Sequence, residues 1–137
     1  MKTIIVGYDD TEPAKRALTR TAELAMAFKA QVVVISAAPA LTPASHGFGP
    51  VDPTDSPEFH REQLERAATL LEERGVEAEY RVALGDPPDA ILQLADELGA
   101  DMIVVGSREL SFIQRLVGQS VSEAVQRKAH CDVLIVH

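Results

Sequence analysis

Short apolar runs alternate with amphipathic stretches along the whole chain. Runs rich in β-branched residues predict five buried strands, at residues 3–8, 31–36, 76–82, 101–106 and 132–136. Between them, apolar residues recur every three or four positions, which predicts helices at about 11–28, 57–74, 89–98 and 120–128. The third run alternates apolar and polar residues, as is typical of a strand at the edge of a sheet.

Strand and helix alternate from end to end, and this order predicts an α/β fold with a parallel sheet and right-handed crossovers. We expect a single Rossmann-like domain over residues 1–137. It would have a five-stranded parallel sheet of order 3-2-1-4-5 and helices on both faces. One long connection interrupts the pattern, because five of the eight prolines fall within 38–57, and we expect a loop there.

Composition narrows the classes of function. The chain has a net charge of −8 and lacks the stripe of basic residues that a nucleic-acid binder needs, so no nucleic-acid partner is expected. No apolar run approaches the roughly 20 residues of a membrane span, and the N-terminal residues do not resemble a secretory signal. A cytoplasmic protein without a membrane partner is the expectation. The single Cys131 excludes a disulfide framework within one chain.

Candidate chemistry gathers where the strand order reverses, because ligands of such sheets bind beyond the carboxyl ends of the strands at that point. With the expected order, this point lies between the first and fourth strands. The residues that border it are Gly7, Tyr8, Asp9 and Asp10 on one side, Gly106, Ser107 and Arg108 on the other, and Ser36 and Ala37 at the end of the second strand.

Four stretches of the chain carry recognisable motifs. The first strand ends in Val6-Gly7-Tyr8-Asp9-Asp10-Thr11, which follows the pattern Val-x-x-Asp-x-Ser with Thr for Ser. The turn Gly85-Asp86-Pro87 is followed by Ile91, and the fourth strand ends in Val105-Gly106-Ser107-Arg108. The last stretch runs from Ser120 to Val136. Together these motifs resemble those of the universal stress protein family, and the resemblance covers essentially the whole chain.

ATP-binding members of that family carry G-x2-G-x9-G-[ST] around the phosphates. This chain keeps Gly106 and Ser120 but has Glu109 and Gln119 at the second and third glycines, with Gly118 displaced by one residue. A carboxylate about 4 Å from a phosphate would cost about 4 kcal/mol in a surface-like dielectric. The resemblance therefore implies an adenine-nucleotide site with weakened or altered phosphate binding, for AMP or another ligand with fewer phosphates than ATP.

The resemblance also implies roles for single residues. Asp9 would meet the ribose, and Gly7 and Ala37 would line the adenine pocket. The full set of candidate nucleotide-binding residues is Gly7, Tyr8, Asp9, Ala37, Gly106, Arg108, Gly118, Gln119, Ser120 and Val121. Simpler roles compete with these, since Asp9 could cap the following helix and Ser120 could open a capping box with Glu123. No catalytic residue is predicted, because no base or orienting group is recognisable for Cys131 as a nucleophile. No metal site is predicted, because the histidines lack ligand spacing.

The resulting hypothesis is a stress-response or regulatory module rather than an enzyme. It would form a homodimer through the apolar C-terminal strand Asp132–Val136, since the last strand commonly pairs across a two-fold axis in the resembled family and an exposed edge invites such pairing. Two alternatives stay open: an ATP-binding member with at most slow ATPase activity, and a ligand-free interaction module in which the loop 38–57 covers the crevice or docks a partner.

Overall fold

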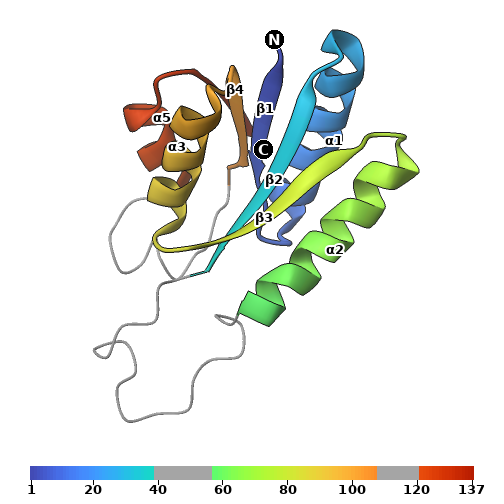
Figure 1. Ribbon diagram of the computed structural model, residues 1–137, viewed down its shortest axis with the longest axis horizontal. Helices are drawn as coiled ribbons and strands as arrows, with labels where there is room; N and C mark the ends of the chain where they lie inside the picture. Colours follow the sequence, from blue (N-terminus) through green and yellow to red (C-terminus); the bar gives the residue numbers. More distant parts are fainter. Residues whose placement is uncertain (39–56, 108–120) are drawn as a thin grey trace.

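One five-stranded, fully parallel sheet organises the chain in the order β3-β2-β1-β4-β5, as predicted (Figure 1). The computed structural model describes residues 1–38, 57–107 and 121–137. The strands are β1 (Thr3–Gly7), β2 (Gln31–Ala38), β3 (Ala78–Leu84), β4 (Met102–Gly106) and β5 (Asp132–Val136). The strand order reverses between β1 and β4, where Val6 lies opposite Val104. The carboxyl ends of these two strands therefore lie side by side.

Helices cover both faces of the sheet, as Figure 1 shows. One face carries α1 (Glu12–Phe28) and α2 (Pro57–Glu73), and the other carries α3 (Pro87–Leu98) and α5 (Val121–Lys128). The period of two in β1 divides its side chains between them, because Ile4 and Val6 pack with α1 and α2 whereas Ile5 packs with α3 and α5. All three are fully buried. Each such side chain contributes roughly 1.5–3 kcal/mol, so the inner strands fix the register of the sheet.

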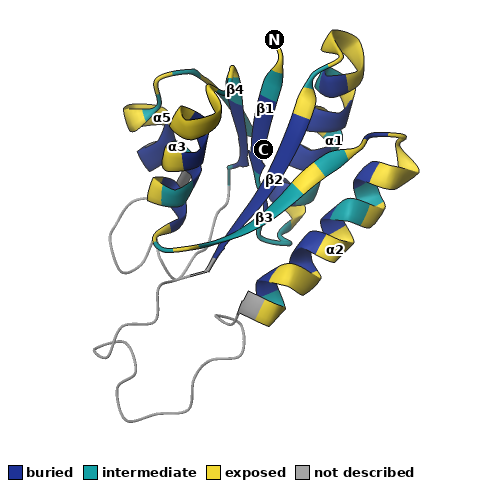
Figure 2. Cartoon of the chain, viewed as in Figure 1, coloured by how far each residue is buried: buried dark blue, intermediate teal, exposed yellow. Residues whose placement is uncertain are grey.

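Burial falls from the middle of the sheet to its edges (Figure 2). The inner strands β1, β2 and β4 are mostly buried, whereas β3 and β5 consist largely of half-buried and exposed residues. The alternating run at 76–82 was predicted as an edge strand, and β3 does lie at one edge. Among the described residues, no helix combines the length and the apolar character that crossing a membrane requires.

Several boundaries differ from the sequence prediction. The strand β1 ends at Gly7 rather than at residue 8, and β3 begins at Ala78 rather than at 76. Val76 belongs to the turn after α2, because its N–H donates to the carbonyl of Leu71. The loop predicted at 38–57 is too long at both ends. Residue 38 still belongs to β2, where it pairs with Leu84 of β3, and residue 57 already begins α2. Residues 39–56 lie outside the described part of the chain.

Candidate functional site

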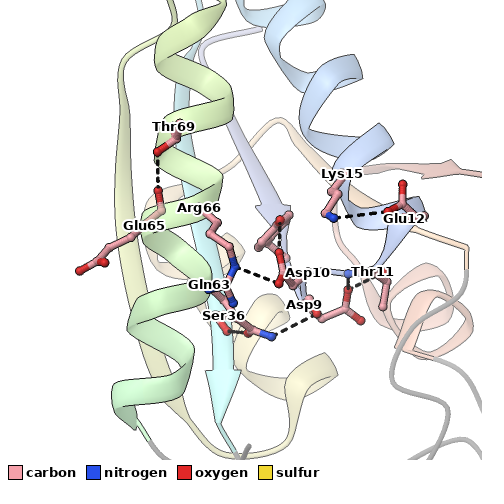
Figure 3. A network of polar contacts seen from close by, with 11 residues as sticks. Asp9, Asp10, Thr11, Glu12, Lys15, Ser36, Gln63, Glu65, Arg66 and Thr69 are labelled. Carbon is pink, nitrogen blue, oxygen red and sulfur yellow. Dashed lines mark hydrogen bonds and ion pairs between the residues drawn. The ribbon is translucent and has the colours of Figure 1, made fainter.

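The β1–α1 loop, Tyr8–Thr11, crosses the carboxyl end of β1 and faces helix α2 (Figure 3). Thr11 is the N-cap of α1, and its Oγ1 accepts a hydrogen bond from the Ala14 N–H at 3.3 Å. The cap fixes the direction in which the chain leaves the loop, so the side chains of Asp9 and Asp10 have defined positions.

Asp9 is tied to the start of α1 through one carboxylate oxygen. Its Oδ1 accepts hydrogen bonds from the Thr11 Oγ1 at 2.6 Å and from the Thr11 N–H at 3.2 Å. Burial raises the pKa of Asp9 above its ordinary value, although these two hydrogen bonds act in the opposite direction. Thr11, and not Asp9, is therefore the N-cap of α1, and Asp9 holds this cap residue from outside the helix. Both hydrogen bonds from Thr11 use Oδ1, so a ligand contact through Oδ2 is compatible with them.

Asp10 holds a backbone conformation that is costly for a residue with a side chain. Its φ of 65° lies in the left-handed region, where Asp is one of the better tolerated residues. Its Oδ1 accepts a hydrogen bond from the Tyr8 hydroxyl at 2.7 Å, and its Oδ2 forms an ion pair with Arg66 Nε at 3.0 Å. Burial, followed by this contact with Asp10, raises the pKa of Tyr8. These contacts hold the strained residue from both sides.

A buried polar chain continues from the loop into the space between β2 and α2. The Gln63 Nε2 donates to the main-chain carbonyl of Asp9 at 3.2 Å, and Gln63 Oε1 accepts from the Ser36 hydroxyl at 3.1 Å. The Ser36 Oγ also lies 2.5 Å from His60 Nδ1. Ser36, His60 and Gln63 are all buried, at 1%, 6% and 5% exposure. Figure 3 shows Gln63 and Arg66 of α2 pointing towards the loop.

Two of the three glycines predicted at the site, Gly7 and Gly106, lie where a larger residue would collide with its neighbours. A Cβ on Gly106 would lie 2.9 Å from the main chain of Pro13 and Ala14, where α1 begins. A Cβ on Gly7 would lie 2.9 Å from the Cδ1 of Ile91 on α3. Neither glycine has a positive φ. Gly106 therefore allows α1 to approach the end of β4, which is a structural reason for a glycine there.

The structure brings together only part of the predicted set. Gly7, Tyr8 and Asp9 end β1 or follow it, Ala37 lies near the end of β2, and Gly106 ends β4. Val121 is the first residue of α5. The remaining candidates lie outside the described residues: Arg108, Gly118, Gln119 and Ser120, together with Glu109.

Sequence reasoning missed the contribution of α2 to the site. Gln63 and Arg66 contact the loop, yet they were not among the candidates. One signal was available. His60 and Gln63 continue the three- and four-residue spacing of the buried Leu64, Ala67 and Leu71, so they occupy positions that normally take apolar residues. Polar residues within an apolar stripe are informative because burial demands hydrogen-bond partners.

A cavity of about 390 Å³ lies apart from these residues, between α2 and the edge strand β3. Its lining residues are Arg61, Leu64, Glu65, Ala68, Tyr80 and Val82. The polar groups described above converge instead at the carboxyl ends of β1 and β2, next to the point between β1 and β4 where the strand order reverses and where this type of sheet binds ligands. No group of three or more His, Cys, Asp or Glu side chains placed to hold a metal occurs within residues 1–38, 57–107 and 121–137.

Known proteins resemble the chain over its full length. The model of the universal stress protein family matches residues 1–137. A universal stress protein of Mycobacterium tuberculosis is 37% identical, with 99% of this chain and 96% of the relative covered. A putative universal stress protein of Staphylococcus haemolyticus is 31% identical, with 98% and 84% covered.

Solved structures give the same result. A universal stress protein in complex with cAMP is 31% identical, with a TM-score of 0.78 and coverage of 99% of this chain and 97% of that one. A universal stress protein from Archaeoglobus fulgidus in complex with dAMP is 27% identical, with a TM-score of 0.76 and coverage of 100% and 98%.

Proposed function

The chain belongs to the universal stress protein family, and from this premise we propose that it binds an adenine nucleoside monophosphate at the carboxyl ends of β1 and β4. We propose further that the protein acts as a regulatory module in the cytoplasm rather than as an enzyme. The single observation that carries the proposal is Asp9. It is a partly buried carboxylate beside the point where the strand order reverses, and one of its oxygens is held by Thr11.

The ligands of the two structural relatives fit such a carboxylate. Cyclic AMP keeps one free ribose hydroxyl because its other secondary oxygen is esterified, and dAMP keeps one because the other is missing. A single hydroxyl donor requires a single acceptor. Asp9 Oδ1 already accepts two hydrogen bonds from Thr11, so Oδ2 is the oxygen that we assign to the ribose.

The phosphate side supports a monophosphate over ATP on sequence grounds. Glu109 and Gln119 stand at two of the three glycine positions of the family's ATP motif. Glu109 would repel a triphosphate more than a monophosphate, because a triphosphate places more negative charge in the same region. We therefore expect cyclic AMP and AMP to bind more tightly than ATP, with at most slow turnover of ATP.

Calorimetry with cyclic AMP, AMP and ATP tests this proposal. The expected order has ATP weakest, and a Glu109→Gly variant should gain affinity mainly for ATP. Equal or tighter binding of ATP by the wild type would contradict the role given to Glu109. If none of the three nucleotides binds, the proposed function is wrong as a whole.

We also propose that two copies pair through β5. It is the outer strand of the sheet, and its apolar residues from Val133 to Val136 are only half-buried in the single chain. An edge of this kind is a template for a second strand. Sedimentation analysis should show a dimer for the wild type and a shift towards monomer for Ile135→Lys, provided that circular dichroism shows the variant to be folded. A monomeric wild type would refute the pairing.

A further inference from the structure

The β1–α1 loop is tied to α2 by contacts that span more than fifty residues of sequence. Gln63 and Asp9 are separated by 54 positions, and Arg66 and Asp10 by 56. The loop contains the residue assigned to the ligand, whereas α2 contains none of the residues assigned to it. The position of Asp9 therefore depends on a helix that is not itself predicted to contact the nucleotide.

Chemistry fixes the direction of every hydrogen bond in the chain that ends at Asp9. A main-chain carbonyl can only accept, so it must face the Nε2 of Gln63, and the Oε1 of Gln63 must then face Ser36. Since Oε1 can only accept, the Ser36 hydroxyl donates to it, and Ser36 Oγ accepts from the N–H of His60 Nδ1. The amide of Gln63 thus has only one workable orientation.

An apolar side chain would satisfy the packing at position 63 with less difficulty. Gln63 lies in the stripe of α2 that packs against the sheet, beside Leu64 and Ala67. A buried amide needs both of its polar ends to be hydrogen-bonded, and burying it gains less than burying a leucine. The hydrogen bond from Gln63 to the main-chain carbonyl of Asp9 explains why a glutamine occupies this position.

We propose that Gln63 is a positioning residue that sets the direction of the Asp9 carboxylate for the nucleotide. This inference rests on the proposed function. Ser36 orients the amide, the amide fixes the Asp9 carbonyl, and Thr11 fixes the carboxylate on the other side of the same residue. Arg66 acts on the neighbouring residue through Asp10, so α2 holds the loop at two successive positions.

The decisive variant is Gln63→Glu, which has the same shape as glutamine. An ionised glutamate cannot donate to the Asp9 carbonyl, so cyclic AMP affinity should fall about tenfold at neutral pH, in line with the cost of one lost hydrogen bond. Protonation restores one donor. As the pH falls, the affinity of this variant relative to the wild type at the same pH should therefore rise towards one.

The ratio to the wild type at each pH cancels every effect that the substitution leaves unchanged, including that of the charged and titratable groups around position 63. These are His60 and Arg66 on α2, and Tyr8, Asp9 and Asp10 in the loop, all of which both proteins share. Gln63→Leu should show a similar loss of affinity with a ratio that does not change with pH. Glu62→Gln is the matched control, because this exposed side chain lies on the same turn of α2, and it should bind like the wild type.

A second measurement decides the matter without any ligand. The N–H groups of Thr11 and Ala14 bond to Asp9 and Thr11, so their hydrogen exchange reports the loop directly. In Gln63→Leu, these amides should lose protection while those in the strands keep it. If the wild type binds no nucleotide, the proposed function fails and exchange alone judges the positioning role. Unchanged protection at Thr11 and Ala14, or a pH-independent ratio for Gln63→Glu, would overturn the inference.

Discussion

Two aspartates at opposite ends of the sheet accept the same number of hydrogen bonds, yet their pKa values shift in opposite directions. Asp101 precedes β4 at the amino end, and its Oδ2 accepts from the N–H groups of Lys2 at 2.7 Å and Thr3 at 2.9 Å. Asp9 follows β1 at the carboxyl end, and its Oδ1 accepts from Thr11 twice. The pKa of Asp101 is lowered, chiefly by its two hydrogen bonds, whereas burial raises the pKa of Asp9.

Exposure to water explains the difference. Asp101 is exposed, so its charge stays hydrated and the hydrogen bonds from the main chain favour the ionised form. Asp9 is partly buried, and the loss of hydration outweighs the same kind of contact. A carboxylate kept at such a cost is typical of a functional site, whereas one that binds the start of a strand in water has a structural role. The two ends of one sheet are thus specialised.

Replacing Asp9 should give the largest effect and separates ligand binding from stability. Asp9→Asn should weaken cyclic AMP binding about 10- to 100-fold, because hydrogen bonds to charged groups contribute about 1.5–3 kcal/mol. The free energy of unfolding at neutral pH should stay equal or rise. A raised pKa means that ionised Asp9 disfavours the folded state above that pKa, and asparagine removes this charge. Calorimetry and urea unfolding measure the two quantities. A loss of stability at neutral pH would mean that Asp9, like Asp101, has a structural role.

Gly106→Ala tests how much of the carboxyl end serves packing. The new Cβ would meet main-chain atoms of Pro13 and Ala14, which cannot rotate away, so we expect a loss of about 1–3 kcal/mol in urea unfolding. Gly7→Ala is the matched control. Its Cβ would meet the flexible end of Ile91, so its effect should be smaller. Equal losses for both variants would contradict the packing role given to Gly106.

Acid should affect the two aspartates in sequence. If the nucleotide binds ionised Asp9, cyclic AMP affinity should fall about tenfold per pH unit below the raised pKa of this residue. Asp101 contributes stability that is present above its unfolded pKa and is lost only as the pH falls through its lowered folded pKa. Binding should therefore weaken before the Asp101 contact is lost. Titration calorimetry from neutral pH downwards measures the fall, and Asp9→Asn should flatten the curve.

Asp101→Ala should reduce stability less than Gly106→Ala and leave nucleotide binding unchanged. The substitution removes the acceptor for the Lys2 and Thr3 N–H groups, so hydrogen exchange of these two amides should accelerate. Asp101→Asn retains an oxygen acceptor and should protect the same amides without dependence on acid. A marked loss of cyclic AMP affinity in either variant would contradict the assignment of a purely structural role to the amino end of the sheet.

The smallest net effect is expected for Asp10→Gly. Glycine relieves the cost of the left-handed backbone, about 1–2 kcal/mol, but loses the contacts to Tyr8 and Arg66. The two changes oppose each other, so the free energy of unfolding should change by less than about 1 kcal/mol. Arg20→Met, which removes an exposed ion pair to Glu23 on α1, gives a matched control for loss of a surface contact. A large destabilisation would show that the contacts of Asp10 with Tyr8 and Arg66 stabilise the fold by more than the left-handed backbone costs.

The sequence alone determined the strands, the helices, their order and the loop that holds Asp9. These follow from local patterns, since apolar spacing reports which face of an element is buried and the residues of the β1 end stand next to one another. The family motif predicts Asp9 as a site residue for the same reason, because the residues of the motif are adjacent in the sequence.

Only the tertiary structure decided what surrounds Asp9. Packing between residues far apart in sequence determines how α2 is rotated about its axis and how closely it approaches the sheet. This orientation brings the Gln63 amide within hydrogen-bond distance of the main-chain carbonyl of Asp9. Burial, a property of the whole fold, then gives Asp9 and Asp101 opposite pKa shifts although both are aspartates beside a strand. Local pattern specifies the elements, whereas the energy of a charge depends on everything packed around it.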